Sequence, residues 1–124
     1  MENLYEESMK EINSTFDKNF LKFKETYIDR LPDMIMHATK NYDYPVYIKI
    51  NKYNLTNNKS NRAMYDIACY NGKDIKKEII KKIGNEFKVD IEFFHAYEYV
   101  VINIKWKSEE RVKLERLLRN LFNK

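Results

Sequence analysis

The sequence predicts an α+β fold: a small sheet of three or four strands, mainly antiparallel, with helices packed on one face and a long amphipathic helix at the N-terminus. Three observations carry this prediction. Apolar residues recur at helical spacing through the first 27 residues, two segments within residues 87–106 alternate as paired strands, and further helical stretches flank that pair. The expected element order is α-α-β-(β)-α-β-β-α, in which the bracketed strand is optional.

Length and composition are typical of one soluble domain spanning residues 1–124. Hydrophobic residues make up 44% and charged residues 34% of the chain, too apolar for a disordered tail and too charged for a membrane span. The acidic start, residues 1–7, lacks the pattern of a secretory signal, and the single Cys69 favours a reducing compartment. We therefore expect a cytoplasmic, intracellular protein with no membrane partner.

Residue usage excludes some nucleotide-binding motifs and indicates the kind of genome that encodes the protein. Two glycines and two prolines are too few for the phosphate loops and dinucleotide fingerprints that need several glycines at fixed spacing. No cofactor is therefore expected. Lys, Asn, Ile and Tyr have A/T-rich codons, and their heavy use is typical of phages, large DNA viruses and low-GC bacteria. The host cell of a virus is thus one expected setting.

Charge is unevenly distributed along the chain. Residues 1–43 hold nine acidic and six basic residues, a net charge of −3, whereas residues 44–124 hold ten acidic and seventeen basic, a net charge of +7. The sequence is accordingly interpreted as an N-terminal helical arm (1–31) and a basic body (44–124). The two parts are expected to attract each other, or the body to attract an acidic partner such as nucleic acid.

The first helix carries a long apolar stripe on one side. Its spacings of three and four residues follow an eleven-residue repeat, which gives a nearly straight stripe about 33 Å long at 1.5 Å per residue. Packing on the chain's own sheet is the commoner use of such a stripe, and contact with a second copy is the alternative for any part that a small sheet leaves uncovered. The stripe consists of Tyr5, Met9, Ile12, Phe16, Phe20, Phe23 and Tyr27.

Two short elements follow the arm. Pro32 is expected to kink or end the first helix and to begin a second helix over residues 32–40, with Asp33 near its positive end. Residues 44–51 alternate apolar and polar side chains, which predicts a half-buried strand. The apolar positions of these elements are Met34, Ile35 and Ala38 in the helix and Val46, Ile48 and Ile50 in the strand.

The segment after this strand has two interpretations. Residues 54–61 are polar and predict an exposed loop. In residues 62–70, Tyr65, Ile67 and Cys69 alternate as in a strand, whereas Met64, Ile67 and Ala68 fit a helix. A short strand is the favoured interpretation.

The clearest strand signal is a hairpin that folds about Ala96 and Tyr97. Segments 87–94 and 99–106 then pair so that one face is apolar throughout. The pairs on that face are Phe93 with Val100, Ile91 with Ile102, Val89 with Ile104 and Phe87 with Trp106. The other face receives Phe94 with Tyr99, Glu92 with Val101, Asp90 with Asn103 and Lys88 with Lys105. A slip of one residue would destroy this sorting.

Two helices are expected on either side of the hairpin. Residues 73–83 place isoleucines at helical spacing, with Gly84 as a natural stop. Ser108 is a good N-cap for a terminal helix, and acidic residues follow it where they complement the helix dipole. The apolar side of that terminal helix is Leu114, Leu117, Leu118 and Leu121.

A group of acidic side chains suggests metal chemistry, but weakly. Asp90 and Glu92 lie two apart on the outer face of one strand, and His95 and Glu98 follow in the turn, so together they could hold a divalent cation. A metal nuclease of this kind needs a carboxylate at the position that Asn103 occupies, so Asn103 counts against that hypothesis. Solvated acidic residues are the ordinary case on an exposed strand, and no nucleophile triad is apparent. The sequence predicts no metal site and no catalytic residue.

These observations favour a non-catalytic interaction module that forms a homo-oligomer or docks on a partner protein through the stripe. The alternative is a sequence-nonspecific nucleic-acid-binding protein, in which lysines and arginines contact phosphates while Phe94 and Tyr99 stack on bases. A metal-dependent hydrolase is the least favoured hypothesis. The basic residues of the alternative are Lys73, Lys76, Lys77, Lys81, Lys88, Lys105, Lys107 and Arg111.

Overall fold

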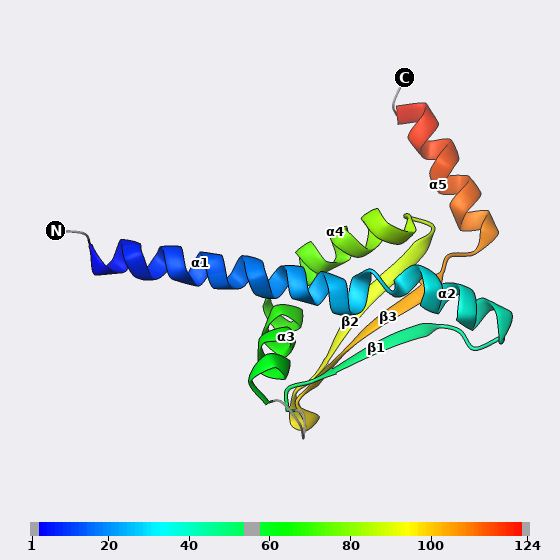
Figure 1. Cartoon of the computed structure of the whole chain (residues 1–124). Helices are drawn as coiled ribbons and strands as arrows, with labels where there is room; N and C mark the ends of the chain where they lie inside the picture. The colour runs from blue at the N-terminus through cyan, green and yellow to red at the C-terminus, as the bar shows by residue number, and fades with distance from the viewer. Residues whose placement is uncertain (1–2, 54–57, 123–124) are drawn as a thin grey trace.

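The computed structural model describes residues 3–53 and 58–122 and shows an α+β fold (Figure 1). Helix α1 (Leu4–Phe23) runs through a π-helical turn, η1 (Lys24–Ile28), into α2 (Leu31–Lys40). Strand β1 (Val46–Asn51) precedes α3 (Asn58–Tyr70) and α4 (Gly72–Ile83). Strands β2 (Phe87–Phe94) and β3 (Tyr99–Trp106) are joined by the turn η2 (His95–Tyr97) and followed by α5 (Glu109–Phe122).

The three strands form an antiparallel sheet in the order β1-β3-β2. The pairing of β2 with β3 confirms the predicted hairpin register along its whole length, from Phe87 opposite Trp106 to Phe94 opposite Tyr99. Strand β1 adds to the other edge of β3, with Val46 opposite Ile104. The apolar faces of the three strands therefore coincide and form one inner face.

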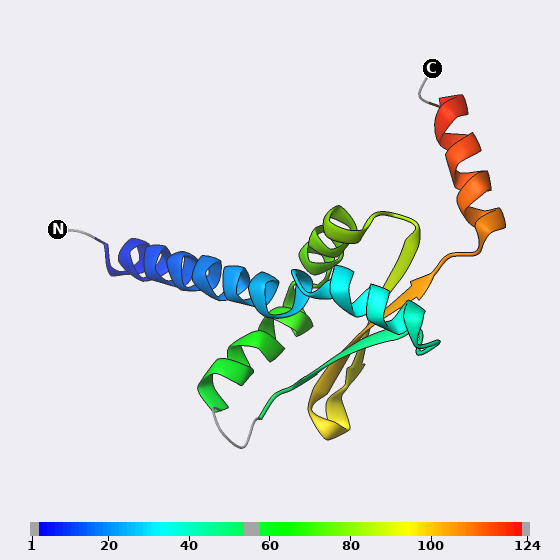
Figure 2. The same ribbon diagram turned by 45° about the vertical axis from the view of Figure 1, so that its right-hand side comes forward.

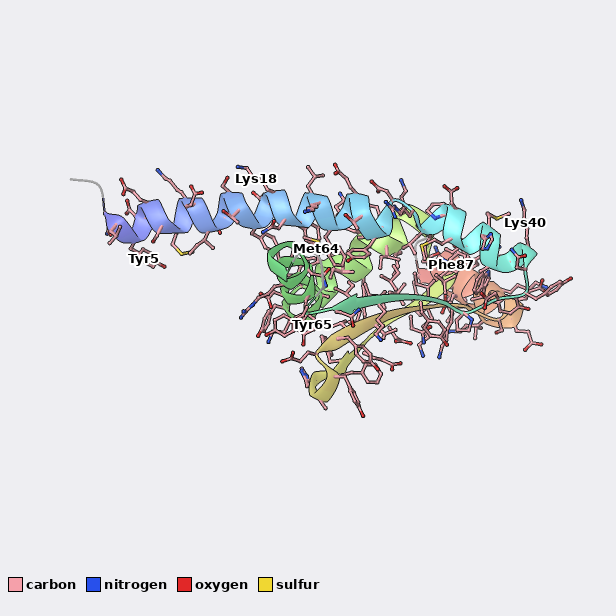
Figure 3. All side chains as sticks on the ribbon, turned by 60° about the horizontal axis from the view of Figure 1, so that its bottom comes forward. Tyr5, Lys18, Lys40, Met64, Tyr65 and Phe87 are labelled. Atoms are coloured by element: carbon pink, nitrogen blue, oxygen red, sulfur yellow. The ribbon has the colours of Figure 1, made fainter. Side chains whose placement is uncertain are left out.

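Helices cover the inner face of the sheet, as predicted. In Figure 3, α1, α2 and α3 lie on one side of the strands, and α4 packs on the same face because its buried isoleucines join the core. Since side chains alternate along each strand, the opposite face is polar and aromatic. The largest fully buried side chains are Phe23, Ile28, Leu31, Ile50, Ile75, Ile79, Ile102, Ile104 and Val100.

Residues 62–70 are helical, so the predicted short strand is wrong. Met64 and Tyr65 are adjacent and both buried, with 3% and 8% exposure, whereas a strand would direct neighbours to opposite faces. Ile67 and Ala68 complete the same helical side. Local sequence allowed both spacings, and packing of α3 against β1 and α1 selected the helix. Residues 58–61 of the predicted loop begin this helix, and residues 54–57 lie outside the described residues.

The turn η1 shifts the register of the N-terminal stripe. The Asp29 amide donates to the Lys24 carbonyl at 2.9 Å, a five-residue bond that places one extra residue in the turn. Phe23 and Ile28 consequently both reach the core, with 0% and 1% exposure. Tyr27, predicted for the stripe, lies partly buried beside them. Pro32 occupies the first turn of α2, as the sequence predicted.

Candidate functional site

The apolar stripe of α1 divides into a buried part and a projecting part. Phe23 belongs to the core, and Phe16 and Phe20 pack against it. Towards the N-terminus the stripe leaves the body: Tyr5 is 68% and Ile12 58% exposed. Figure 3 shows Tyr5 on the side of α1 that faces α3, but beyond α3, while Lys18 points to the opposite side. Tyr5, Met9 and Ile12 form what we call the projecting stripe.

A groove of about 410 Å³ opens where the projecting stripe meets α3. We call it the α1–α3 groove. Its two charged lining residues, Glu11 and Asp66, are both acidic, and neither forms an ion pair within the described chain. The groove is therefore apolar with acidic side chains and suits a partner that is apolar and basic. Its other lining residues are Ile12, Thr15, Phe16, Asn19, Ala63, Ile67, Tyr70 and Asn71.

Sequence reasoning missed the α3 wall of this groove. Ala63, Asp66 and Ile67 come together because residues 62–70 are helical. The signal that could have found them was the helical spacing of Met64, Ile67 and Ala68, which the alternation of neighbouring residues obscured.

Helix α5 projects from the body with its leucines in solvent. Figures 1 and 2 show it leaving the end of β3 and pointing away from the sheet, and none of its described residues is buried. Leu114, Leu117 and Leu121 are 55%, 57% and 61% exposed. The predicted apolar side therefore exists, but the expectation that helices cover their apolar sides on the sheet fails for α5.

Ion pairs tie the polar side of α5 to the body. Lys107 Nζ lies 2.9 Å from Glu115 Oε2, and Arg116 Nη2 lies 3.4 Å from Glu86 Oε1. The hydrogen bond from Lys107, with a second from Arg111, holds the pKa of the Glu115 carboxyl below its ordinary value. Because the Glu115 side faces the body, with Leu118 at its edge, Leu114, Leu117 and Leu121 face outward.

The predicted basic residues lie on two sides of the sheet. Lys73, Lys76, Lys77 and Lys81 are exposed on α4, which packs on the inner face, whereas Lys88 and Lys105 face each other across the outer face. Lys107 and Arg111 both pair with Glu115. No single face therefore holds all eight.

The outer face of the sheet carries a row of aromatic rings near the hairpin turn. Tyr99 stacks on Phe94 with ring centroids 4.7 Å apart and lies 6.1 Å from Tyr97. Lys49 Nζ lies 4.2 Å from the centroid of the Tyr99 ring, a cation–π contact. This places the two stacking residues predicted from the sequence side by side, with an ammonium group beside them.

The acidic group near the turn does not converge. Asp90 pairs with Lys88 at 3.8 Å, and Glu98 pairs with Lys52 at 3.6 Å. His95 stacks on Phe93 instead of approaching the carboxylates. Across the described ranges, no group of three or more His, Cys, Asp or Glu side chains is arranged to hold a metal ion.

Tyr65, which is buried, and Cys69, which is partly buried, form a polar pair on α3. Burial, followed by the hydrogen bond to Cys69, raises the pKa of Tyr65 to about 12. Burial also raises the pKa of the Cys69 thiol, although the bond from Tyr65 opposes this effect. Since the thiolate is the nucleophilic form, a raised pKa lowers the nucleophilicity of Cys69.

Comparisons with known proteins do not assign the chain to a family. No protein-family model, curated protein or solved structure matches the chain. None of the described helices combines the length and apolar character needed to cross a bilayer.

Proposed function

We propose that this protein is a non-catalytic interaction module that self-associates through its N-terminal helix. The observation that carries the proposal is the projecting stripe. A helix side with large apolar residues extends past the body that buries the rest of it, and an apolar groove adjoins it. Contiguous exposed apolar surface of this kind is typical of protein-interaction sites.

The free energy of burying apolar side chains favours contact between the projecting stripe and a partner surface. Fully burying a large apolar side chain contributes about 1.5 to 3 kcal/mol, and Tyr5 and Ile12 are each more than half exposed. Charge supports contact between copies, because residues 1–43 (net −3) and the body, residues 44–124 (net +7), have opposite signs. A second copy supplies both an apolar and a basic partner surface.

Charged substitutions in the projecting stripe are expected to weaken self-association. Tyr5→Lys combined with Ile12→Lys should raise the dissociation constant about 100-fold or more, because each lysine would be desolvated at an apolar contact. The measurement is mass by light scattering or sedimentation over a dilution series. Leu21→Lys is the matched control, since Leu21 is 54% exposed on the same helix but lies off the stripe.

Two results would count against this function. A wild-type protein that keeps its monomer mass of 15.2 kDa at tens of micromolar excludes self-association. An equal loss of association in the Leu21→Lys control would show that the projecting stripe is not the contact.

The outer sheet face favours a second candidate, binding of single-stranded nucleic acid. Tyr99, Phe94 and Lys49 combine stacking rings with a cation, and Lys88 and Lys105 lie on the same face. Open sheets with exposed aromatic rings bind single strands by stacking bases, while lysines neutralise phosphates. In this candidate function the nucleic acid contacts the outer face of the sheet and does not contact the lysines of α4.

Replacing Tyr99 by alanine tests this candidate. Since stacking contributes about 1 to 3 kcal/mol per base, affinity for a labelled single strand should fall about 5- to 150-fold in fluorescence anisotropy. Tyr42→Ala, at an exposed tyrosine on the α2–β1 connection, should leave affinity unchanged. Absence of binding by the wild type at low salt, where phosphate contacts are strongest, would eliminate the candidate.

A further inference from the structure

The outward leucine side of α5 has the residue spacing of a helix that docks into an apolar groove. Its exposed leucines stand at positions i, i+3, i+4 and i+7, the spacing with which amphipathic helices dock into apolar grooves. Two ion pairs direct the polar side of the helix to the body. Leu114, Leu117 and Leu121 thereby remain exposed for contact. The residues concerned are Leu114, Leu117, Leu118 and Leu121.

We propose that the α1–α3 groove of one copy binds α5 of a second copy. The inference rests on the proposed function and names the partner surface for the projecting stripe. The groove adjoins that stripe through Ile12 and is lined by both α1 and α3, so a docked helix lies along α1 and covers the exposed leucines and the stripe together.

Charge complementarity supports this pairing. Glu11 and Asp66 line the groove without an ion pair in the described chain. Lys113 borders the leucine side of α5, as its helical position relative to Leu117 shows, whereas Arg111 on the other border already pairs with Glu115. A leucine-rich helix bordered by Lys113 brings a positive charge to the rim of the acidic groove.

Dimensions and position also agree. Helix α5 has 14 residues, about 21 Å at 1.5 Å per residue, and the projecting stripe and the groove together follow α1 from Tyr5 to Asn19, about 21 Å on the same scale. Figures 1 and 2 show α5 and the projecting end of α1 on opposite sides of the molecule. The groove of a copy is therefore reached by the α5 of another copy.

Such a contact joins two different surfaces of the chain, and when it is reciprocated about a two-fold axis the whole interface is isologous. Its smallest closed form is a dimer in which each copy gives α5 to the other.

Two full-length variants test the proposed contact, and each is damaged on one surface only. The groove variant combines Ile12→Lys with Asp66→Lys, and the α5 variant combines Leu117→Lys with Leu121→Lys. All four positions are exposed, and circular dichroism confirms that both variants fold.

Each variant alone is expected to run at the monomer mass, with association at least about 100-fold weaker than wild type. Mixing equal amounts should restore complexes, because intact α5 of the groove variant meets the intact groove of the α5 variant. Leu21→Lys and Asn120→Lys, on other sides of α1 and α5, should associate like wild type.

Other outcomes overturn the inference in distinguishable ways. If wild type associates, each variant is monomeric and the mixture stays monomeric, α5 and the groove do not bind each other across copies. If the α5 variant associates as wild type does, α5 is not the occupant. In both cases self-association through α1 survives. A monomeric wild type removes the proposed function and the inference together.

Discussion

Replacing Phe23 by alanine is expected to lower the free energy of unfolding by about 3 to 5 kcal/mol. The Phe23 side chain is fully buried, and its ring centroid lies 5.0 Å from that of Tyr27, with the rings tilted by 56°, at the junction of α1 and η1. Truncation leaves a cavity that surrounding helices fill incompletely, since core packing is close to that of a crystal. Urea denaturation followed by circular dichroism measures the change.

Ile12→Ala is the counterpart on the same stripe. Its side chain is 58% exposed, and alanine has high helix propensity, so the expected change in the free energy of unfolding is at most about 0.5 kcal/mol. Both variants should be compared at a concentration low enough to keep the chain monomeric. Comparable losses in the two variants would show that α1 is buried along its whole length.

Gly84→Ala is expected to destabilise the protein by about 1 to 3 kcal/mol. Gly84 ends α4 with φ 98° and ψ 163°, a conformation that essentially only glycine adopts. The alanine methyl group would also lie 2.5 Å from Glu86 Oε2, but that side chain can move. Backbone strain therefore accounts for most of the loss, which thermal unfolding would measure.

Gly72→Ala is the matched control at the other end of α4. A methyl group there meets Ile91 Cδ1 at 3.5 Å, an ordinary contact, and no positive φ is required. Because alanine restricts the unfolded chain, we expect a neutral effect or a gain of about 0.4 to 1 kcal/mol. Unfolding temperatures that fall equally in both variants would refute the strain argument.

The hairpin is an example of structure that residue spacing alone predicts. Its two strands are adjacent in the chain, and one register makes every pair on one face apolar, so the pairing of Ile91 with Ile102 followed from the residues alone. The apolar sides of α1 and α5 and the break near Pro32 were predictable for the same reason: each depends on spacing within a few residues.

The candidate site was only half predictable. The stripe containing Ile12 could be read from periodicity, but its partner wall on α3 could not, because residues 62–70 satisfied both a strand and a helix pattern. Contacts with β1 and α1, distant in sequence, decided between them. The η1 turn, which brings Ile28 into the core, likewise follows from packing and not from local spacing.

The sequence by itself therefore determined which side of each helix is apolar and how the hairpin pairs, since both follow from residue spacing. Tertiary structure alone decided which apolar sides are covered. A three-stranded sheet has one inner face of limited area, which α1 to α4 occupy. Phe23 falls within that area and is buried, whereas Ile12 and the leucines of α5 fall outside it and remain exposed.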